Sequence, residues 1–479
     1  MTTRCEDLCD LSATVLASQI RAKKLSPVEL IRAVYARLHQ TDPKINAFCT
    51  LCEEEASQAA KNAETAVMRG DVLGILHGIP ISIKDLLWTR GIRTMFGSRT
   101  RETFIPDEDS PAVAKVLAAG GIPIGKTTTS EFGFKAVTDS PVTGITRNPW
   151  DLNKTAGGSS GGAGAAVAAG IGPLALGTDG AGSIRIPAAF NGVFGLKPSY
   201  GRVAAYPPNP VPFLSHVGPM TRTVRDAALL LNVIAGPDER DLLSLPADPT
   251  DYLVACEGGI RGLRVAWSPT FGYAKVDAEV ASISDAAARS FEKMLGCHLE
   301  VADPGFESPH SPFAILWTTS YALRFQALLP EWKSRMDPDL VTLIESASHF
   351  GPSHFAQALA GRSVLWQTTR AFFERFELLL TPTLPVPAFA ACRNAPEGMI
   401  GPSGPLPPFP DWLPFTYPWN LTGQPAATVP CGFTRNGIPV GLQIVGRRFA
   451  DATVLRAAAA FEDAHPWAHQ WPVLHGILR

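Results

Sequence analysis

The sequence has no excess of charge of either sign. Its 479 residues include 42 Lys and Arg against 44 Asp and Glu, which leaves a formal net charge of −2. Proteins that bind nucleic acid through its phosphates need a basic surface. We therefore expect no nucleic-acid partner, and no long run of like charge indicates an interaction tail.

Cysteine is scarce as well, with eight residues in the chain, so a disulfide scaffold is not expected. Cys49 and Cys52 form a single C-x-x-C pair without a second pair or a His pair at ligand spacing. We interpret them as small core residues rather than zinc ligands. Because an H-E-x-x-H motif is also lacking, we expect neither a metal nor a cofactor.

No long apolar run predicts a membrane span. The most membrane-like stretch, GGAGAAVAAGIGPLALG at residues 161–177, is rich in Gly and Ala and contains Pro173. It is more typical of a buried helix of small residues. The first residues, MTTRCEDLCDLS, lack the apolar core of a secretion signal. The prediction is a protein with no membrane partner and a cytoplasmic location.

The hydrophobic pattern that is present alternates between helical and strand periods. Residues 10–70 are predicted to be helical, and one helix begins at Ser26 with Pro27 and Glu29 as in a capping box. Later segments predict strands, helices and a hairpin that turns at Asn436-Gly437. These are strands 79–87, 122–127, 263–267 and 378–381, helix 110–119, hairpin 428–446 and a helix from Asp451. Such alternation indicates an α/β protein.

One motif matches a phosphate-binding loop only by its letters. Gly120-x4-Gly125-Lys126-Thr127 fits the pattern, but a functional loop needs a strand before its first glycine and a helix after its Thr. Here the predicted order is reversed, and Pro123 removes one backbone N–H. We interpret the segment as a turn from a helix into a strand.

A second motif, Gly158-Ser159-Ser160-Gly161-Gly162, matches G-x-S-x-G. A nucleophile elbow needs a strand that leads directly into the serine, whereas the preceding RNPWDLNKTA is predicted to be a loop. A Ser-His-Asp enzyme also needs a catalytic histidine. None of the histidines, His216 and His298 among them, lies in a Gly- or Asp-rich context.

Two other features favour a different catalyst. Lys84 lies within an apolar strand, and a buried lysine tends toward the neutral amine, which can act as a base. The cluster Gly180-Ala181-Gly182-Ser183 places small residues before a serine, so that successive N–H groups can converge on an oxyanion. Either feature alone also fits an ordinary snorkelling lysine or a tight turn.

Together with the second glycine-serine cluster, these features resemble the amidase signature family. The resemblance covers residues 157–198, GGSSGGAGAAVAAGIGPLALGTDGAGSIRIPAAFNGVFGLKP. HGIPISIKD upstream and NLTGQPAATVP and GIPVGLQIVGR downstream extend it over nearly the whole chain. It implies one large α/β domain over residues 1–479, with a mixed β-sheet flanked by helices on both faces. Within it we distinguish a helical segment 1–70, a catalytic core 71–245, a helical aromatic cap-like segment 246–370 and the remaining sheet and final helix 371–479.

The resemblance also implies roles for individual residues. Ser183 matches the nucleophile, Ser159 the bridging serine on a cis peptide bond, and Lys84 the base. The backbone of Gly180, Ala181, Gly182 and Ser183 matches the oxyanion hole, and Ala181 departs from the family's usual glycine. The residues that match the support of this loop are Ser160, Thr178, Asp179 and Arg185.

The function implied is hydrolysis of the C–N bond of a small carboxylic amide through an acyl-enzyme on Ser183. Three alternatives stay open at this point. They are a carbamate or ester hydrolase with the same triad, the glutaminase subunit of a tRNA-dependent amidotransferase, and a non-catalytic scaffold. The small-molecule amide is the expected partner, with a homodimer as one option for the assembly.

An apolar or aryl substrate is expected from the aromatic residues near the end of a loop predicted at 392–418. The segment PSGPLPPFPDWLPFTYPWN, residues 402–420, contains Phe409, Trp412, Phe415, Tyr417 and Trp419, with Asp411 as its only charge, and the cap-like segment adds Phe313, Trp317, Tyr321 and Phe325. Pocket linings are mostly apolar and aromatic. The residues predicted to line the pocket are Phe134, Trp317, Phe415 and Trp419.

Overall fold

The computed structural model describes residues 8–399 and 412–472, and its core is an 11-stranded sheet. The strands lie in the order β1-β3-β2-β8-β10-β9-β14-β15-β13-β11-β12. Their bounds are β1 Phe48–Leu51, β2 Pro80–Lys84, β3 Ile122–Thr127, β8 Leu174–Asp179, β9 Phe194–Lys197, β10 His216–Thr221, β11 Arg264–Trp267, β12 His298–Val301, β13 Leu378–Pro382, β14 Ala426–Phe433 and β15 Pro439–Gly446.

The sheet is mixed, as the sequence predicts. β2 pairs in parallel with both β3 and β8, and β11 does so with β12 and β13. The strands between these two groups pair antiparallel. Two small two-stranded sheets lie outside the main one, formed by β4 Asp139–Ser140 with β5 Gly144–Ile145 and by β6 Arg147–Asn148 with β7 Asp151–Thr155.

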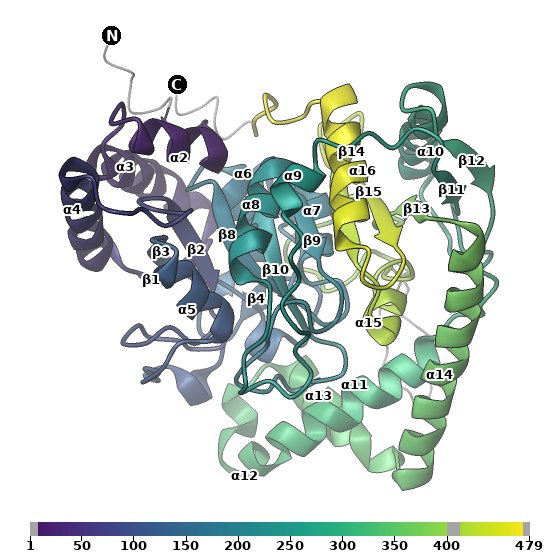
Figure 1. Ribbon diagram of the computed structural model, residues 1–479. Helices are drawn as coiled ribbons and strands as arrows, with labels where there is room; N and C mark the ends of the chain where they lie inside the picture. The colour runs from purple at the N-terminus through teal and green to yellow at the C-terminus, as the bar shows by residue number, and fades with distance from the viewer. Residues whose placement is uncertain (1–7, 400–411, 473–479) are drawn as a thin grey trace.

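Helices cover both faces of the sheet (Figure 1). Their bounds are α2 Ala13–Arg21, α3 Pro27–Ile45, α4 Glu53–Arg69, α5 Pro111–Ala118, α6 Gly161–Ala168, α7 Arg185–Asn191, α8 Val224–Ile234, α9 Tyr252–Ala255, α10 Ala278–Lys293, α11 His310–Phe325, α12 Leu329–Trp332, α13 Pro338–Ser346, α14 Pro352–Arg375, α15 Pro418–Thr422 and α16 Asp451–Ala464. Short 3-10 helices are η1 Arg99–Arg101, η2 Glu131–Gly133, η3 Gln326–Leu328, η4 Lys333–Arg335 and η5 Ala347–His349.

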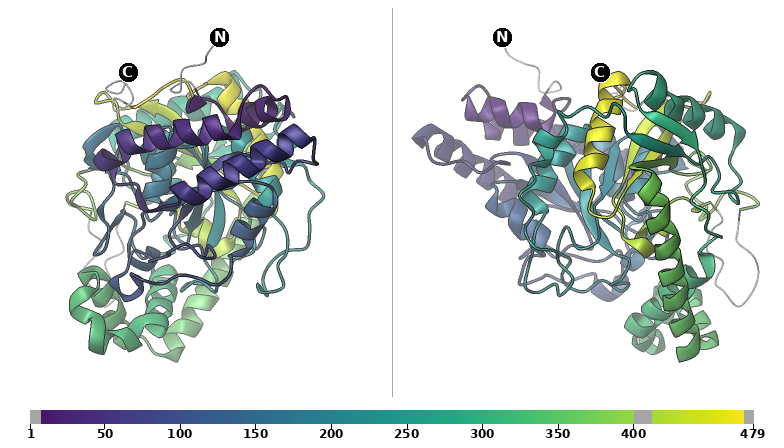
Figure 2. Two further views of the ribbon diagram at one scale, coloured as in Figure 1. Left: turned by 90° about the vertical axis from the view of Figure 1, so that its left-hand side faces the viewer. Right: turned by 45° about the vertical axis from the view of Figure 1, so that its right-hand side comes forward.

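The two faces bury different clusters because side chains alternate along a strand. On β13, Leu378 and Leu380 belong to the cluster that includes residues of α8, α10 and α16, whereas Leu379 belongs to an aromatic-rich cluster with residues of α11, α13 and α14. Figure 2 shows α11 to α14 as a helical projection at one end of the molecule, and α3 beside α4 near the other. The protein is therefore a single large α/β domain.

Local signals in the sequence account for many element boundaries. The Ser26 side chain accepts hydrogen bonds from the Val28 and Glu29 N–H groups, and the capping box is complete, as predicted. Gly437 has φ of 74° in the turn between β14 and β15, which confirms the predicted hairpin. The segment 246–370 contributes β11 and β12 to the sheet edge as well as the projecting helices.

Two predictions of local structure are wrong. The segment predicted as wholly helical contains β1, whose register pairs Phe48 with Thr127 of β3, because tertiary pairing at the sheet edge outweighs local propensity. RNPWDLNKTA, predicted as a loop, forms the β6–β7 hairpin. Of the predicted loop 392–418, residues 400–411 with Phe409 and Asp411 lie outside the described residues. No helix in the described part of the chain combines the length and apolar character needed to cross a membrane.

Candidate active site

The candidate site lies where two parallel strands of the sheet end. β2 ends at Lys84 and its neighbour β8 ends at Asp179. The carboxyl ends of adjacent parallel strands meet at the same edge of a sheet, where α/β proteins commonly bind ligands. The loop before α6 brings Ser159 to this edge, and the loop between β8 and α7 brings Ser183.

Lys84 is fully buried and is surrounded by hydroxyl groups. Its Nζ lies 2.7 Å from Ser159 Oγ, 2.8 Å from Ser160 Oγ and 2.9 Å from Thr178 Oγ1. Burial lowers the pKa of Lys84 well below its ordinary value, and the charge of Asp179 opposes this shift only partly. Since burial disfavours the charged amine, the geometry favours a neutral lysine that can accept a proton.

The two adjacent serines differ in their other hydrogen bonds. Ser160 Oγ donates to the Thr178 carbonyl at 3.2 Å and accepts from the Thr178 N–H at 3.3 Å. The Ser160 N–H also donates to the Ser183 carbonyl at 3.2 Å, which joins the two glycine-serine loops. Ser160 is therefore engaged on several sides, while Ser159 faces Lys84.

The peptide bond between Gly158 and Ser159 is cis, as the resemblance implies. A side chain at position 158 could not be accommodated, because a Cβ atom there would lie 2.4 Å from the carbonyl carbon of Val137. Glycine at this position therefore lets the chain pass close to Val137 and present Ser159 to Lys84.

A buried ion pair supports the loop that carries Ser183. Arg185 Nε and Nη2 each donate to Asp179 at 2.9 Å, and both side chains are fully buried. Burial alone would raise the pKa of Asp179, but Arg185 outweighs this and holds it below the usual range. Asn420 Nδ2 also donates to Asp179, at 2.8 Å, and Gln443 Oε1 accepts from Arg185 at 2.8 Å.

The four residues of the predicted oxyanion hole differ in what their N–H groups do. Gly182 has φ of 127° and its N–H donates to Asp179 Oδ1 at 2.7 Å. Within residues 8–399 and 412–472, the N–H groups of Gly180, Ala181 and Ser183 have no hydrogen-bond acceptor. Ala181 does not adopt the left-handed backbone conformation that favours glycine, so alanine fits this position.

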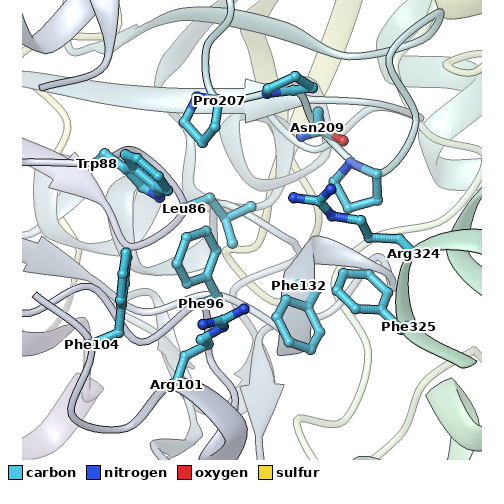
Figure 3. Close-up of a pocket in the computed structure, with 12 residues that line it drawn as sticks. Leu86, Trp88, Phe96, Arg101, Phe104, Phe132, Pro207, Asn209, Arg324 and Phe325 are labelled. Carbon is cyan, nitrogen blue, oxygen red and sulfur yellow. The ribbon is translucent and has the colours of Figure 1, made fainter. Parts of the chain in front are cut away.

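A pocket of about 310 Å³ lies close to the loop that carries Ser159 (Figure 3). Its walls are mainly apolar and include Leu86, Trp88, Phe96, Phe104, Phe132 and Phe325, and the other lining residues are Arg101, Pro207, Pro208, Asn209, Pro210 and Arg324. A Cβ atom placed on Gly133 would lie 2.9 Å from Leu86 Cδ1 and 3.2 Å from Ser159 Oγ. Leu86 of the pocket and Ser159, the candidate bridging serine, therefore both lie close to Gly133.

The aromatic residues predicted to line a pocket lie around these loops in different ways. Trp317 is beside the Ser183 loop, because a Cβ on Gly180 would lie 3.1 Å from its ring. Phe415 and Trp419 are fully buried and flank Thr416, whose carbonyl accepts from Arg185. Phe134 is buried in the same aromatic cluster. None of these four residues lines the pocket in Figure 3. Phe325, another aromatic residue of the cap-like segment, does line it.

The remaining motifs have structural partners. Lys126 of the phosphate-loop match is buried and donates to the Leu87 carbonyl and to Thr94 Oγ1, and the segment follows α5 and enters β3, as predicted. His216 is buried, with Nδ1 2.8 Å from the Leu214 carbonyl. Among the described residues, no group of His, Cys, Asp and Glu side chains could hold a metal ion.

Several residues of the site were not identified from the sequence. Thr416, Asn420 and Gln443 support the Asp179–Arg185 pair, yet they come from segments that follow it by more than two hundred residues. Asn420 and Gln443 do lie within the downstream motifs NLTGQPAATVP and GIPVGLQIVGR. Those motifs were the only sequence signal for a role at the site.

Comparisons with known proteins identify the family of the chain. The family profile described as Amidase matches residues 29–455. The chain is 40% identical over 473 residues to an acylamidase of Rhodococcus erythropolis, covering 96% of this chain and 97% of that protein. It is 36% identical over 501 residues to a glutamyl-tRNA(Gln) amidotransferase subunit of Geobacillus thermodenitrificans (strain NG80-2), covering 98% of this chain and 100% of that protein. A bacterial aryl acylamidase of the amidase signature family has a similar structure, with a TM-score of 0.88, 32% identity and 98% coverage of both chains.

Proposed function

The chain belongs to the amidase signature family and is an amidohydrolase, and from this premise we propose that it hydrolyses small apolar or aryl amides through an acyl-enzyme on Ser183. The observation that carries the proposal is the 2.7 Å contact between the buried Lys84 Nζ and Ser159 Oγ. Beside this contact lies an aromatic pocket.

Proton counting favours Ser159 over Ser160 as the bridge. A neutral amine has two N–H donors and one lone pair, so only one hydroxyl around Lys84 needs to donate to it. The Ser160 hydroxyl already donates to the Thr178 carbonyl. Of the two serines, Ser159 is therefore the one with a hydroxyl proton available to the Lys84 lone pair.

The reaction then proceeds in two balanced halves. Ser183 Oγ attacks the amide carbonyl as its proton passes to Ser159 and the Ser159 proton passes to Lys84. The tetrahedral intermediate breaks its C–N bond as the proton returns through Ser159 to the leaving nitrogen. Water then attacks the acyl-enzyme by the same relay and releases the carboxylic acid and Ser183.

Three backbone N–H groups are available to stabilise the oxyanion in each half. Gly182 donates to Asp179, so we assign this role to the N–H groups of Gly180, Ala181 and Ser183. Fixed donors of this kind stabilise charge that develops only in the transition state. The Asp179–Arg185 pair supports the same loop, because the Asp179 carboxylate accepts hydrogen bonds from the Gly182 and Ile184 N–H groups.

The substrate class is supported by the pocket. Its aromatic walls suit an apolar ring, and among the residues that the structure describes no carboxylate belongs to its lining. Glutamine would need both a cationic and an anionic partner for its α-carboxylate and α-ammonium groups. The similarity to an acylamidase supports the same choice.

Two other functions are consistent with the same catalytic groups. The 36% identity to a subunit of an amidotransferase favours the glutaminase alternative. An acyl-enzyme mechanism also accepts carbamate or ester leaving groups. The cluster of Lys84, Ser159 and Ser160 counts against a non-catalytic scaffold, and the homodimer and the cytoplasmic location stay predictions.

The test compares kcat/KM for 4-nitroacetanilide with kcat/KM for glutamine, using purified protein and Ser183→Ala as the blank. We expect the anilide to be preferred by at least about tenfold, which corresponds to 1.4 kcal/mol. A tenfold preference for glutamine, or activity that requires an added partner protein, would favour the amidotransferase alternative. Labelling of Ser183 by a fluorophosphonate identifies the nucleophile independently of the substrate.

A further inference from the structure

We propose that the pocket in Figure 3 selects aryl amides whose ring carries a carboxylate, and that Arg101 and Arg324 recognise this group. The inference rests on the proposed function and makes its substrate class more specific. It concerns the part of the substrate that lies away from the bond that is cleaved. It requires that the pocket adjoin the catalytic serines, that it fit a ring, and that the two arginines be available to an anion.

The pocket adjoins the catalytic serines through the short helix η2. Gly133 ends this helix, and a Cβ atom placed on it would approach both Leu86 Cδ1 and Ser159 Oγ. Phe132, the preceding residue, forms part of the pocket wall. A substrate whose reacting carbonyl is near Ser159 and Ser183 can therefore extend a substituent over Leu86 into the pocket.

The walls fit a flat ring. Phe132 and Phe325 stack with their centroids 4.1 Å apart, and Phe96 packs against both Phe132 and Phe104 at 6.2 and 6.1 Å. Trp88 closes the remaining side at 5.5 Å from Phe104. Aromatic rings pack against one another in stacked or edge-on arrangements, so an aryl group of the substrate continues the packing that the protein already has.

Both arginines lie on elements that contact other residues of the pocket wall. Arg101 ends η1, and its guanidinium lies over the Phe104 ring at 5.6 Å. Arg324 precedes Phe325 at the end of α11, and the Tyr321 hydroxyl on the same helix donates to the Phe132 carbonyl at 3.0 Å. In Figure 3 the two guanidinium groups point toward the space around Leu86 from different sides.

Three acids near these segments are engaged with other partners. Glu131, in η2, accepts from Ser98 Oγ and from the Asp337 N–H, both at 2.6 Å. Two further acids form ion pairs with other arginines, namely Glu102 with Arg99 and Glu108 with Arg240. Across residues 8–399 and 412–472, neither Arg101 nor Arg324 forms an ion pair with an acid.

Two cations without acidic partners at an apolar pocket attract an anion. A guanidinium binds a carboxylate with two parallel hydrogen bonds, which fixes its orientation. A substituent whose only charge is an ammonium group would be repelled by the same pair. Because both arginines are solvent-exposed, the attraction should weaken as salt is added.

The experiment uses two pairs of substrates that differ only in the para substituent of the ring. One pair, 4-acetamidobenzoate and 4-methylacetanilide, places the ring on the leaving amine. The other, terephthalamic acid and 4-methylbenzamide, places it on the acyl group. In at least one pair we expect kcat/KM for the carboxylate to exceed that for the methyl compound by about tenfold at low salt, since two exposed ion pairs contribute up to ~1 kcal/mol each.

Two variants remove the charges and one controls for surface charge in general. Arg101→Gln and Arg324→Gln should each reduce the ratio of kcat/KM for the carboxylate to kcat/KM for the methyl compound several-fold. The control is Arg99→Gln, which removes an exposed arginine from η1 that does not line the pocket, and it should leave the preference unchanged. Added salt should reduce the preference of the wild type and not that of the double variant.

The outcomes separate this inference from the proposed function. Equal turnover of carboxylate and methyl compounds in both pairs overturns the selection of anions and leaves the aryl amidase intact. A preference that survives in the double variant overturns the role of the arginines. If neither pair reacts while glutamine does, the proposed function itself is wrong.

Discussion

The assignment of Ser159 rather than Ser160 as the proton relay makes the sharpest prediction, because the two residues are adjacent and almost equally close to Lys84. Their Oγ atoms lie 2.7 and 2.8 Å from Nζ, so distance does not distinguish them. Their other partners do. The Ser160 hydroxyl donates to the Thr178 carbonyl and accepts from the Thr178 N–H, and this is a structural role that alanine would remove without breaking the relay.

Ser159→Ala should therefore lower kcat/KM by ~10²- to 10⁴-fold, which is the usual cost of losing one proton-transfer group. Ser160→Ala should lower it by about tenfold or less, because one hydrogen bond contributes ~0.5–1.5 kcal/mol. The free energy of unfolding should show the opposite order, with Ser160→Ala the more destabilised of the two variants. Ser160→Ala leaves buried polar groups of Thr178 with fewer partners, which costs about 1–3 kcal/mol of unfolding free energy.

The assay is kcat/KM for an aryl anilide together with urea unfolding of the same preparations, with Ser183→Ala as the inactive reference. Unfolding data identify a variant that is inactive because it is misfolded. If Ser160→Ala loses more activity than Ser159→Ala while both remain folded, the proton assignment is wrong. The nucleophile-elbow interpretation of the same motif would then have to be considered again.

Two further predictions concern ionised groups. Because burial lowers the pKa of Lys84, kcat/KM should rise with pH as the amine loses its proton and reach its plateau below the ordinary lysine pKa of ~10.4. If the residual activity of Lys84→Ala shows the same pH profile as the wild type, the profile does not report Lys84 and the prediction is wrong. Asp179→Asn should cost about 3–5 kcal/mol of unfolding free energy at neutral pH, because it leaves the Arg185 charge buried without its partner. The folded-state pKa of Asp179 is depressed, so the stability that it contributes is present above its unfolded value of ~3.9 and is lost as pH falls through the folded value. The difference between wild type and variant in urea unfolding should accordingly narrow in acid, and a constant difference would refute the ion-pair explanation.

The candidate catalytic residues could be proposed from the sequence because their determinants are local. Lys84 stands out as a charged residue in an apolar strand, and the serines stand out because glycines surround them. The structure supplies the reason for the glycines, since a Cβ on Gly158 would collide with the Val137 backbone and one on Gly182 would lie 2.7 Å from Thr416 Cβ. These steric requirements are visible in the sequence as glycines, and the resemblance to the family depends on those glycines.

The support of the centre could be predicted only in part. Asp179 and Arg185 lie within the central motif, but Thr416 and Asn420 are brought to them by α15 and its preceding loop. Nothing in the local pattern of PFTYPWN distinguishes the two polar residues that bind the ion pair from the aromatic residues that pack around it. The sequence indicated the aromatic residues of this segment for a pocket, whereas Phe415 and Trp419 are fully buried in the core.

The pocket could not be predicted because it has no motif of its own. Its wall is assembled from the segment after β2, from η1 and η2, from the loop before β10 and from the end of α11, which adjoin only when the sheet and the helical projection are in place.

In an enzyme built this way, the reaction and the choice of substrate depend on different kinds of residues. The proposed chemistry requires the glycines, serines and lysine of these loops, whereas specificity can change through exposed positions such as Arg101 and Arg324 that the proposed mechanism does not use. One active centre is therefore compatible with both relatives, the 40% identical acylamidase and the 36% identical amidotransferase component. The residues that face the pocket, rather than overall identity, should decide between their substrates.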